Sequence, residues 1–125
     1  MRILLVDDDE LLAELLEMTL SIEGYDVAVC TNGAEGIKRL QHDQFDVVVL
    51  DLMMPFMDGL QFMRVLTGMA SPPPVVVLSA VGKGDLVRDV LAAGAKAVVA
   101  KPVETDELLG TIQRVVMAGA HPQGV

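Results

Sequence analysis

Short runs of valine, isoleucine and leucine recur along the chain, separated by longer segments whose apolar residues lie three and four positions apart. Three of the runs, ILLV near the start and VVVL twice, are continuously apolar. Such runs predict strands that are covered on both faces, as in a parallel sheet, whereas the more mixed second run suits a sheet edge. The predicted strands are residues 2–6, 25–30, 45–50, 75–78 and 97–100.

The segments between these runs have the period of amphipathic helices. In the first segment, which Gly24 ends, the predicted apolar face comprises Leu11, Leu12, Leu15, Leu16, Thr19 and Ile22. Further helices are expected at about 34–40, after Asp58-Gly59, around 86–91, and after Pro102 with Thr105 as the N-terminal cap. Strict alternation of strands and helices predicts one α/β domain, doubly wound, with helices on both faces of a five-stranded parallel sheet.

Composition places the chain among soluble globular proteins. It has 125 residues, 52% of them hydrophobic and 22% charged, which is enough for one packed domain. We expect this domain over residues 1–118 and a disordered tail over 119–125. A net charge of −9 argues against direct binding to nucleic acid. No apolar run reaches the roughly 18–20 residues of a membrane-spanning helix, so we expect a cytoplasmic protein that does not enter membranes.

Four of the five predicted strands end in a reactive side chain. The first is followed by Asp7 and Asp8, the third by Asp51, the fourth by Ser79 and the fifth by Lys101. Ligands of parallel α/β sheets bind at the carboxyl ends of the strands. We therefore expect these five side chains to meet at one edge of the sheet.

This set of side chains suits phosphoryl transfer. Clustered carboxylates repel one another, and a hard cation such as Mg²⁺ relieves that repulsion. A carboxylate is also a nucleophile toward phosphorus, and a lysine with a hydroxyl can neutralise and hydrogen-bond the phosphoryl oxygens. Taken singly, each piece has a plainer interpretation, such as an acidic helix start or an ordinary turn. Their order on successive strand ends favours a shared site.

Four segments carry a resemblance to a known family. ILLVDDDELLAELL, VVVLDLMMPFMDGL, VVVLSA and GAKAVVAKPV resemble the motifs of response-regulator receiver domains, the chemotaxis-regulator-like modules of two-component signalling. The resemblance extends from about residue 2 to residue 117. It implies a flavodoxin-like fold with strand order 2-1-3-4-5 and five helices.

The resemblance also assigns roles to individual residues. It makes Asp51 the phosphoacceptor, Ser79 the switch hydroxyl and Lys101 the phosphoryl contact, with Ala80 the small neighbour that leaves room for the phosphoryl group. The implied metal ligands for Mg²⁺ are Asp7, Asp8, Asp51 and the backbone carbonyl of Met53. The implied phosphodonor is a phosphohistidine on a sensor histidine kinase or a histidine phosphotransfer protein. The chain would catalyse only its own phosphorylation and slow dephosphorylation, and would otherwise not be an enzyme.

The sequence departs from the family pattern on the fifth strand. Val98 stands where the family usually carries Tyr or Phe, and Val103 where an aromatic often follows the Lys-Pro pair. We therefore expect the switch to be read through the fourth helix, fifth strand and fifth helix, a surface that also makes a homodimer plausible. In the family that the sequence resembles, the residues two positions after the acceptor and after the hydroxyl influence attack by water on the phosphoryl group. Here these are Met53 and Val81, which are apolar and cannot hold a water in line, so we expect a long-lived phosphorylated state.

Two other functions would use parts of the same set of residues. The alternative is a receiver-like interaction module that is not phosphorylated, although such a module would be expected to lack an acid, the acceptor or the lysine. A small phosphatase with Asp51 as its nucleophile would need a second acid two residues downstream, where this chain has Met53. Neither G-x-G-x-x-G nor a Walker-type loop is present, so nucleotide binding lacks support.

Overall fold

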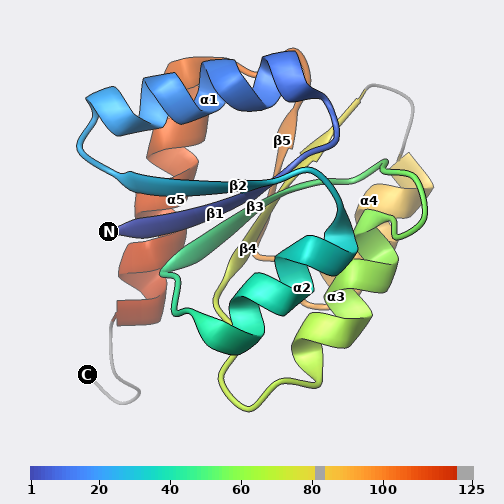
Figure 1. The fold of residues 1–125 in the computed structure, drawn as a ribbon. Helices are drawn as coiled ribbons and strands as arrows, with labels where there is room; N and C mark the ends of the chain where they lie inside the picture. Colours follow the sequence, from blue (N-terminus) through green and yellow to red (C-terminus); the bar gives the residue numbers. More distant parts are fainter. Residues whose placement is uncertain (81–83, 121–125) are drawn as a thin grey trace.

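The computed structural model describes residues 1–80 and 84–120, with the side chains described to residue 118. Strands and helices alternate without exception along these residues (Figure 1). The strands are β1 (Arg2–Val6), β2 (Asp26–Cys30), β3 (Val47–Asp51), β4 (Val75–Ser79) and β5 (Ala97–Ala100). The helices are α1 (Glu10–Ile22), α2 (Gly33–His42), α3 (Gly59–Thr67), α4 (Gly84–Ala92) and α5 (Thr105–Ala120).

The five strands form one parallel sheet in the order β2-β1-β3-β4-β5. Helices α1 and α5 cover one face, and α2, α3 and α4 cover the other (Figure 1). This confirms the predicted doubly wound fold and the edge position of the second strand. No helix in the described ranges is long and apolar enough to cross a membrane.

The central strands show why their sequences are continuously apolar. Every residue of β3 and β4 is at most 5% exposed, because successive side chains point to opposite faces and each face lies under helices. In β1, Ile3 and Leu5 pack with α1 and α5, while Leu4 and Val6 pack with α2 and α3. The sheet therefore separates two hydrophobic cores, and its carboxyl edge is left as the place where polar side chains can gather.

Helix α1 is rotated relative to the prediction. Its core-facing residues are Ala13, Leu16 and Leu20, whereas Leu11 and Ile22 are both 80% exposed. The sequence carries more apolar residues than one buried stripe requires, so periodicity alone could not decide which stripe meets the sheet. Half of the predicted apolar face therefore lies on the surface.

Helix α5 begins one residue earlier than the predicted cap implies. Thr105 is its first helical residue, and the amide of Leu108 donates to the carbonyl of Glu104, so Glu104 occupies the cap position instead of Thr105. The helix continues to Ala120, beyond the expected domain end at residue 118. Residues 121–125 of the predicted tail lie outside the described residues.

Candidate functional site

Strand register brings the predicted site residues to one edge of the sheet. Val6 pairs with Leu50, so Asp7 after β1 comes beside Asp51 at the end of β3. Ser79 ends β4 and pairs with Ala100, which places Lys101 after the neighbouring strand. These reactive side chains thus lie at the carboxyl ends of adjoining strands, as the sequence predicts.

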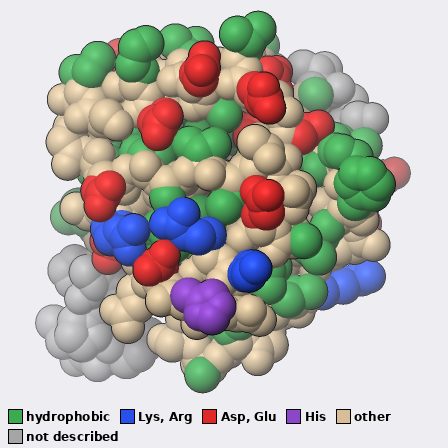
Figure 2. All heavy atoms as spheres, in the orientation of Figure 1, with side chains coloured by type: hydrophobic (Ala, Val, Ile, Leu, Met, Phe, Trp, Pro, Cys, Tyr) green, Lys and Arg blue, Asp and Glu red, His purple; other side chains and the backbone are tan. Residues whose placement is uncertain are grey.

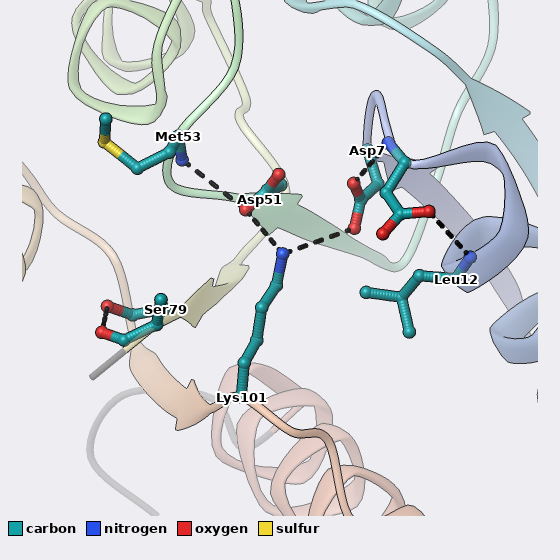
Figure 3. A network of polar contacts seen from close by, with 8 residues as sticks. Asp7, Leu12, Asp51, Met53, Ser79 and Lys101 are labelled. Atoms are coloured by element: carbon teal, nitrogen blue, oxygen red, sulfur yellow. Dashed lines mark hydrogen bonds and ion pairs between the residues drawn. The ribbon is translucent and has the colours of Figure 1, made fainter.

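Lys101 links two of the carboxylates (Figure 3). Its ammonium nitrogen donates to Asp51 Oδ1 at 3.0 Å and lies 3.9 Å from Asp7 Oδ2. One carboxylate oxygen from each of Asp7, Asp8 and Asp51 lies within 4.8 Å of the other two. Asp7 is fully buried and Asp51 is 5% exposed, whereas Asp8 faces solvent. The site is therefore a cluster of three acids, two of which are bridged by one lysine.

The hydrogen bonds of Asp7 leave one oxygen free to accept. Its Oδ1 accepts from the backbone amide of Asp9 at 2.9 Å. Its Oδ2 is buried without a hydrogen-bond partner among the described residues. A buried carboxylate oxygen in that condition is costly unless a cation or water approaches it. Together with Asp8 and Asp51, it fits the oxygen ligand set that Mg²⁺ prefers.

Burial makes both inner acids easier to protonate. Desolvation raises the pKa of Asp51 to about 6, opposed by the hydrogen bond from Lys101 and reinforced by the charge of Asp7. Burial likewise raises the pKa of Asp7, opposed by the amide of Asp9 and by Lys101. The lysine therefore only partly offsets the desolvation and mutual repulsion of the two carboxyl groups.

The remaining predicted residues lie at the same edge. The Met53 amide donates to Asp51 Oδ1 at 3.4 Å, and the Met53 side chain is 47% exposed. Ser79 is 4% exposed, and its hydroxyl donates to the carbonyl of Ala80 at 3.2 Å, so it makes a local contact rather than one with Asp51. Val81 lies outside the described residues. Roles for the Met53 carbonyl and for Ser79 stay predictions.

Sequence reasoning missed how firmly the loop after Asp51 is held. A Cβ on Gly59 would lie 3.0 Å from Leu52 Cα, and a Cβ on Gly33 would lie 2.9 Å from Met57 Sδ. The Gly59 amide also donates to the Leu52 carbonyl at 2.8 Å. These close approaches favour glycine, and the helix starts at Asn32-Gly33 and Asp58-Gly59 were the only signals of them in the sequence. Asp58 caps α3 in a reciprocal bond with Gln61.

A family comparison decides what this edge belongs to. The family model described as the response regulator receiver domain matches residues 3–113. The chain belongs to this family. The match confirms the resemblance found in the sequence. Receiver domains of response regulators are signalling modules of two-component systems.

Individual relatives agree with the family. The response regulator MprA of Mycobacterium leprae is 39% identical over 119 residues, covering 93% of this chain and 51% of MprA. The receiver domain of the Francisella response regulator 1452 has a TM-score of 0.87 at 27% identity, covering 94% of this chain and 98% of that one. A receiver domain from Bermanella marisrubri has a TM-score of 0.86 at 32% identity, covering 92% and 97%. The chain spans about half the length of the curated relatives it matches.

Proposed function

We propose that this receiver domain is a phosphorylation-dependent switch whose Asp51 accepts a phosphoryl group from a phosphohistidine with the help of Mg²⁺. The observation that carries the proposal is the position of Asp51, which is nearly buried, bound by Lys101 at 3.0 Å and clustered with Asp7 and Asp8. A purely structural acid would not need two further carboxylates within reach. The proposed metal ligands are Asp7, Asp8, Asp51 and the Met53 carbonyl, and bound Mg²⁺ would neutralise carboxylate and phosphoryl oxygens.

The chemistry follows from this arrangement. An oxygen of Asp51 attacks phosphorus, the nitrogen–phosphorus bond of the donor breaks, and the leaving imidazole nitrogen takes a proton from solvent. Lys101 already donates a hydrogen bond to Asp51, so after transfer its ammonium group can donate to an oxygen of the attached phosphoryl group instead. Ser79 gives up its bond to the Ala80 carbonyl and donates to a second phosphoryl oxygen.

The proposed output surface lies beyond Ser79. Ser79 is the last residue of β4, and α4 is the next element along the chain, so a movement of Ser79 would alter the surface made by α4, β5 and α5. Leu91 on α4 is 42% exposed and Val98 on β5 is partly buried, so this side of the molecule offers apolar contacts to a partner or a second copy. Phosphorylation shifts the population toward the conformation in which this surface binds. The proposed downstream partner is an effector domain or a separate protein.

The exposed apolar residues of helix α1 support the proposal that the phosphodonor is a protein. Leu11, Leu15, Met18 and Ile22 are 58–80% exposed and follow one another three or four positions apart. They form a stripe along the helix that begins beside the acidic site, and Figure 2 shows apolar side chains along the edge occupied by α1. An exposed apolar stripe of this length favours contact with another protein. We propose that the phosphohistidine protein, located with this domain in the cytoplasm, packs on it.

Intact mass after incubation with acetyl phosphate tests the function. We expect a gain of one phosphoryl group in the presence of Mg²⁺, none with EDTA, and none in Asp51→Asn. The same samples, freed of donor, measure how long the group remains. We expect slow loss, because the half-exposed Met53 offers no polar group to hold a water in line.

A negative result has a defined meaning. Small donors can react slowly, so beryllofluoride, which mimics the bound phosphoryl group, would be tried next. No labelling by acetyl phosphate and no spectral change with beryllofluoride would refute the switch. The chain would then be a receiver-like interaction module that is not phosphorylated.

A further inference from the structure

Phe56 combines two unfavourable features. Its φ is +69°, which makes it the one residue other than glycine with positive φ among the described residues. Its side chain is 98% exposed. The Met57 amide donates to the Pro55 carbonyl at 2.8 Å, which closes a three-residue turn around Phe56. Such γ-turns with positive φ are rare and strained, and a bulky residue there is an outlier.

The strain at Phe56 does not come from a loose loop. On one side, Met54 is 8% exposed and packs in the core beneath α2 and α3. On the other side, Met57 packs on the start of α2 against Gly33, and Asp58 forms the capping box of α3. Both ends of the turn are therefore fixed, and the loop holds the ring of Phe56 away from the protein.

The fold itself makes no use of this ring. At 98% exposure the side chain buries almost nothing, so glycine or asparagine would serve the turn better. A strained residue that its surroundings hold in place favours a functional explanation over a structural one. A rigidly presented aromatic side chain is the typical anchor of a protein–protein contact.

The position of Phe56 indicates which partner it meets. It follows Asp51 by five residues, and the half-exposed Met53 lies between them in sequence. The loop lies at the carboxyl edge of the sheet, where α1 also begins (Figure 1). Any protein that delivers a phosphoryl group to Asp51 must cover this edge, so it meets Phe56 on one side of the site and the stripe of α1 on the other.

The acidic residues around the site indicate what kind of surface the partner has. The exposed charged residues described directly after β1 are the acids Asp8, Asp9 and Glu10, and α1 contains no basic residue. Lys101 is turned inward onto Asp51, and it is the one lysine that the described residues place in the site. A second copy of this chain would bring two acidic edges together, which costs free energy. The edge instead complements a surface that has an apolar pocket and a rim of Lys or Arg.

We propose that Phe56 anchors the protein phosphodonor, by inserting into an apolar, basic-rimmed pocket on the phosphohistidine-bearing protein. This inference rests on the proposed function, because it presupposes that Asp51 is phosphorylated. It adds that transfer from a protein depends on Phe56 whereas transfer from a small molecule does not. Phe56 takes no part in the hydrogen bonds of Asp51 or in the cluster of the three acids, so it acts as a docking residue.

The experiment compares two donors on the same variants. Phe56→Asn and Phe56→Gly remove the ring while tolerating positive φ, and Phe56→Trp keeps an aromatic ring. Met117→Ala, a change of another exposed apolar residue on α5, is the matched control. Each purified protein receives acetyl phosphate in one series and, in the other, each autophosphorylated histidine kinase of the source organism in turn, with transfer followed over time.

The two donors should separate the variants. With the kinase that transfers fastest to the unmodified chain, we expect Phe56→Asn and Phe56→Gly to be slower by roughly 10- to 30-fold, the effect of losing an aromatic anchor. Phe56→Trp and Met117→Ala should stay within about threefold of the unmodified chain. Acetyl phosphate should label all of them equally. The chain has no tryptophan, so the Phe56→Trp ring is also a fluorescence reporter of docking.

Each other result has its own meaning. If acetyl phosphate labels Asp51 but no kinase distinguishes Phe56→Asn from the unmodified chain, the docking role is overturned while the switch stands. If both donors slow equally, Phe56 acts on the site chemistry and the docking role is again wrong. If Phe56→Asn instead changes sedimentation of the chain alone, the partner is a second copy. Failure of acetyl phosphate and beryllofluoride on the unmodified chain refutes the switch itself.

Discussion

Asp51 carries an electrostatic cost that its neighbours only partly remove. Its carboxyl group is 5% exposed and shares the edge of the sheet with Asp7, and Lys101 supplies the one inward-facing positive charge described there. The result is a pKa of about 6, against a usual value of 3.8. The folded state therefore resists ionisation of Asp51 more than the unfolded state does.

Replacing Asp51 should stabilise the metal-free protein in a pH-dependent way. Above pH 6 Asp51 is ionised in both states, and the folded state bears the full cost of about 1.4 kcal/mol per pKa unit. As the pH falls through 6, the folded protein takes up the proton first, and the cost disappears toward pH 4. Asp51→Asn should thus raise the free energy of unfolding by on the order of 2 kcal/mol at pH 8 and by much less at pH 4.5.

Urea unfolding with EDTA at both pH values measures this difference. Asp26→Asn, at an exposed acid on the opposite edge of the sheet, serves as the control and should show no such trend. An Asp51→Asn variant less stable than the unmodified chain at pH 8 would mean that the bond to Lys101 outweighs the burial of the acid.

For single residues, the sequence predicted the positions of the site side chains better than the conformation of the loop beside them. The positions of Asp7, Asp8, Asp51, Ser79 and Lys101 could be predicted because each ends or follows a recognisable strand, and strand ends meet in a parallel sheet, whereas their roles stay predictions. Phe56 was not singled out, because a single residue's backbone angle and exposure depend on packing at both ends of its loop. No pattern along the chain reports either quantity.

For single helices and strands, the sequence pattern predicts where an element lies, whereas packing decides which of its sides is buried. The strands at 2–6 and 97–100 have the predicted bounds, because short apolar runs between turn residues leave little freedom. For α1 the sequence predicted the helix but not the buried side, because Leu11 and Leu15 compete with Leu12 and Leu16 for the sheet. The choice is made by contact with β1, β2 and α5, and the rejected stripe remains on the surface.

Two helical glycines should respond oppositely to the same substitution. A Cβ on Gly36 of α2 would lie 2.9 Å from Val6 Cγ2 and 3.0 Å from Phe62 Cε2, both in the core. Gly36→Ala should therefore lower the free energy of unfolding by about 1–3 kcal/mol through overpacking. A Cβ on Gly110 of α5 would meet only the end of Arg114 at 3.8 Å, so Gly110→Ala should raise it by about 0.5–1 kcal/mol.

Chemical unfolding of both variants and of the unmodified chain measures the two changes in the free energy of unfolding. The variants are controls for each other, because each adds one methyl group to a helix interior. Equal effects would show that helix propensity dominates and that α2 can move away from β1. Opposite signs would show that the close contact between α2, β1 and α3 is needed, and this contact also positions Gly33 under the loop that carries Phe56.

For the molecule as a whole, both faces of the sheet are closed by helices and the described polar cluster lies at its carboxyl edge. Ligands at that edge therefore couple directly to folding stability. The proposed Mg²⁺ site belongs to the folded cluster and has no equivalent in the unfolded chain, so Mg²⁺ should stabilise the protein by about 2.7 kcal/mol at 100 times its dissociation constant. Thermal unfolding in MgCl₂, compared with NaCl at equal ionic strength, measures this shift.

Two variants decide whether the shift comes from the cluster. Asp8→Ala removes an exposed side chain of the proposed ligand set without opening the core, and should abolish the Mg²⁺-dependent rise in Tm. Asp26→Ala removes one negative charge at the opposite edge and should keep it, although its ion pair with Arg2 is lost. An equal rise in both variants would contradict a specific site, because it would mean that Mg²⁺ acts by screening the net charge of −9. A rise that only Asp8→Ala loses would assign the stabilisation to the same oxygens that lie around Asp51.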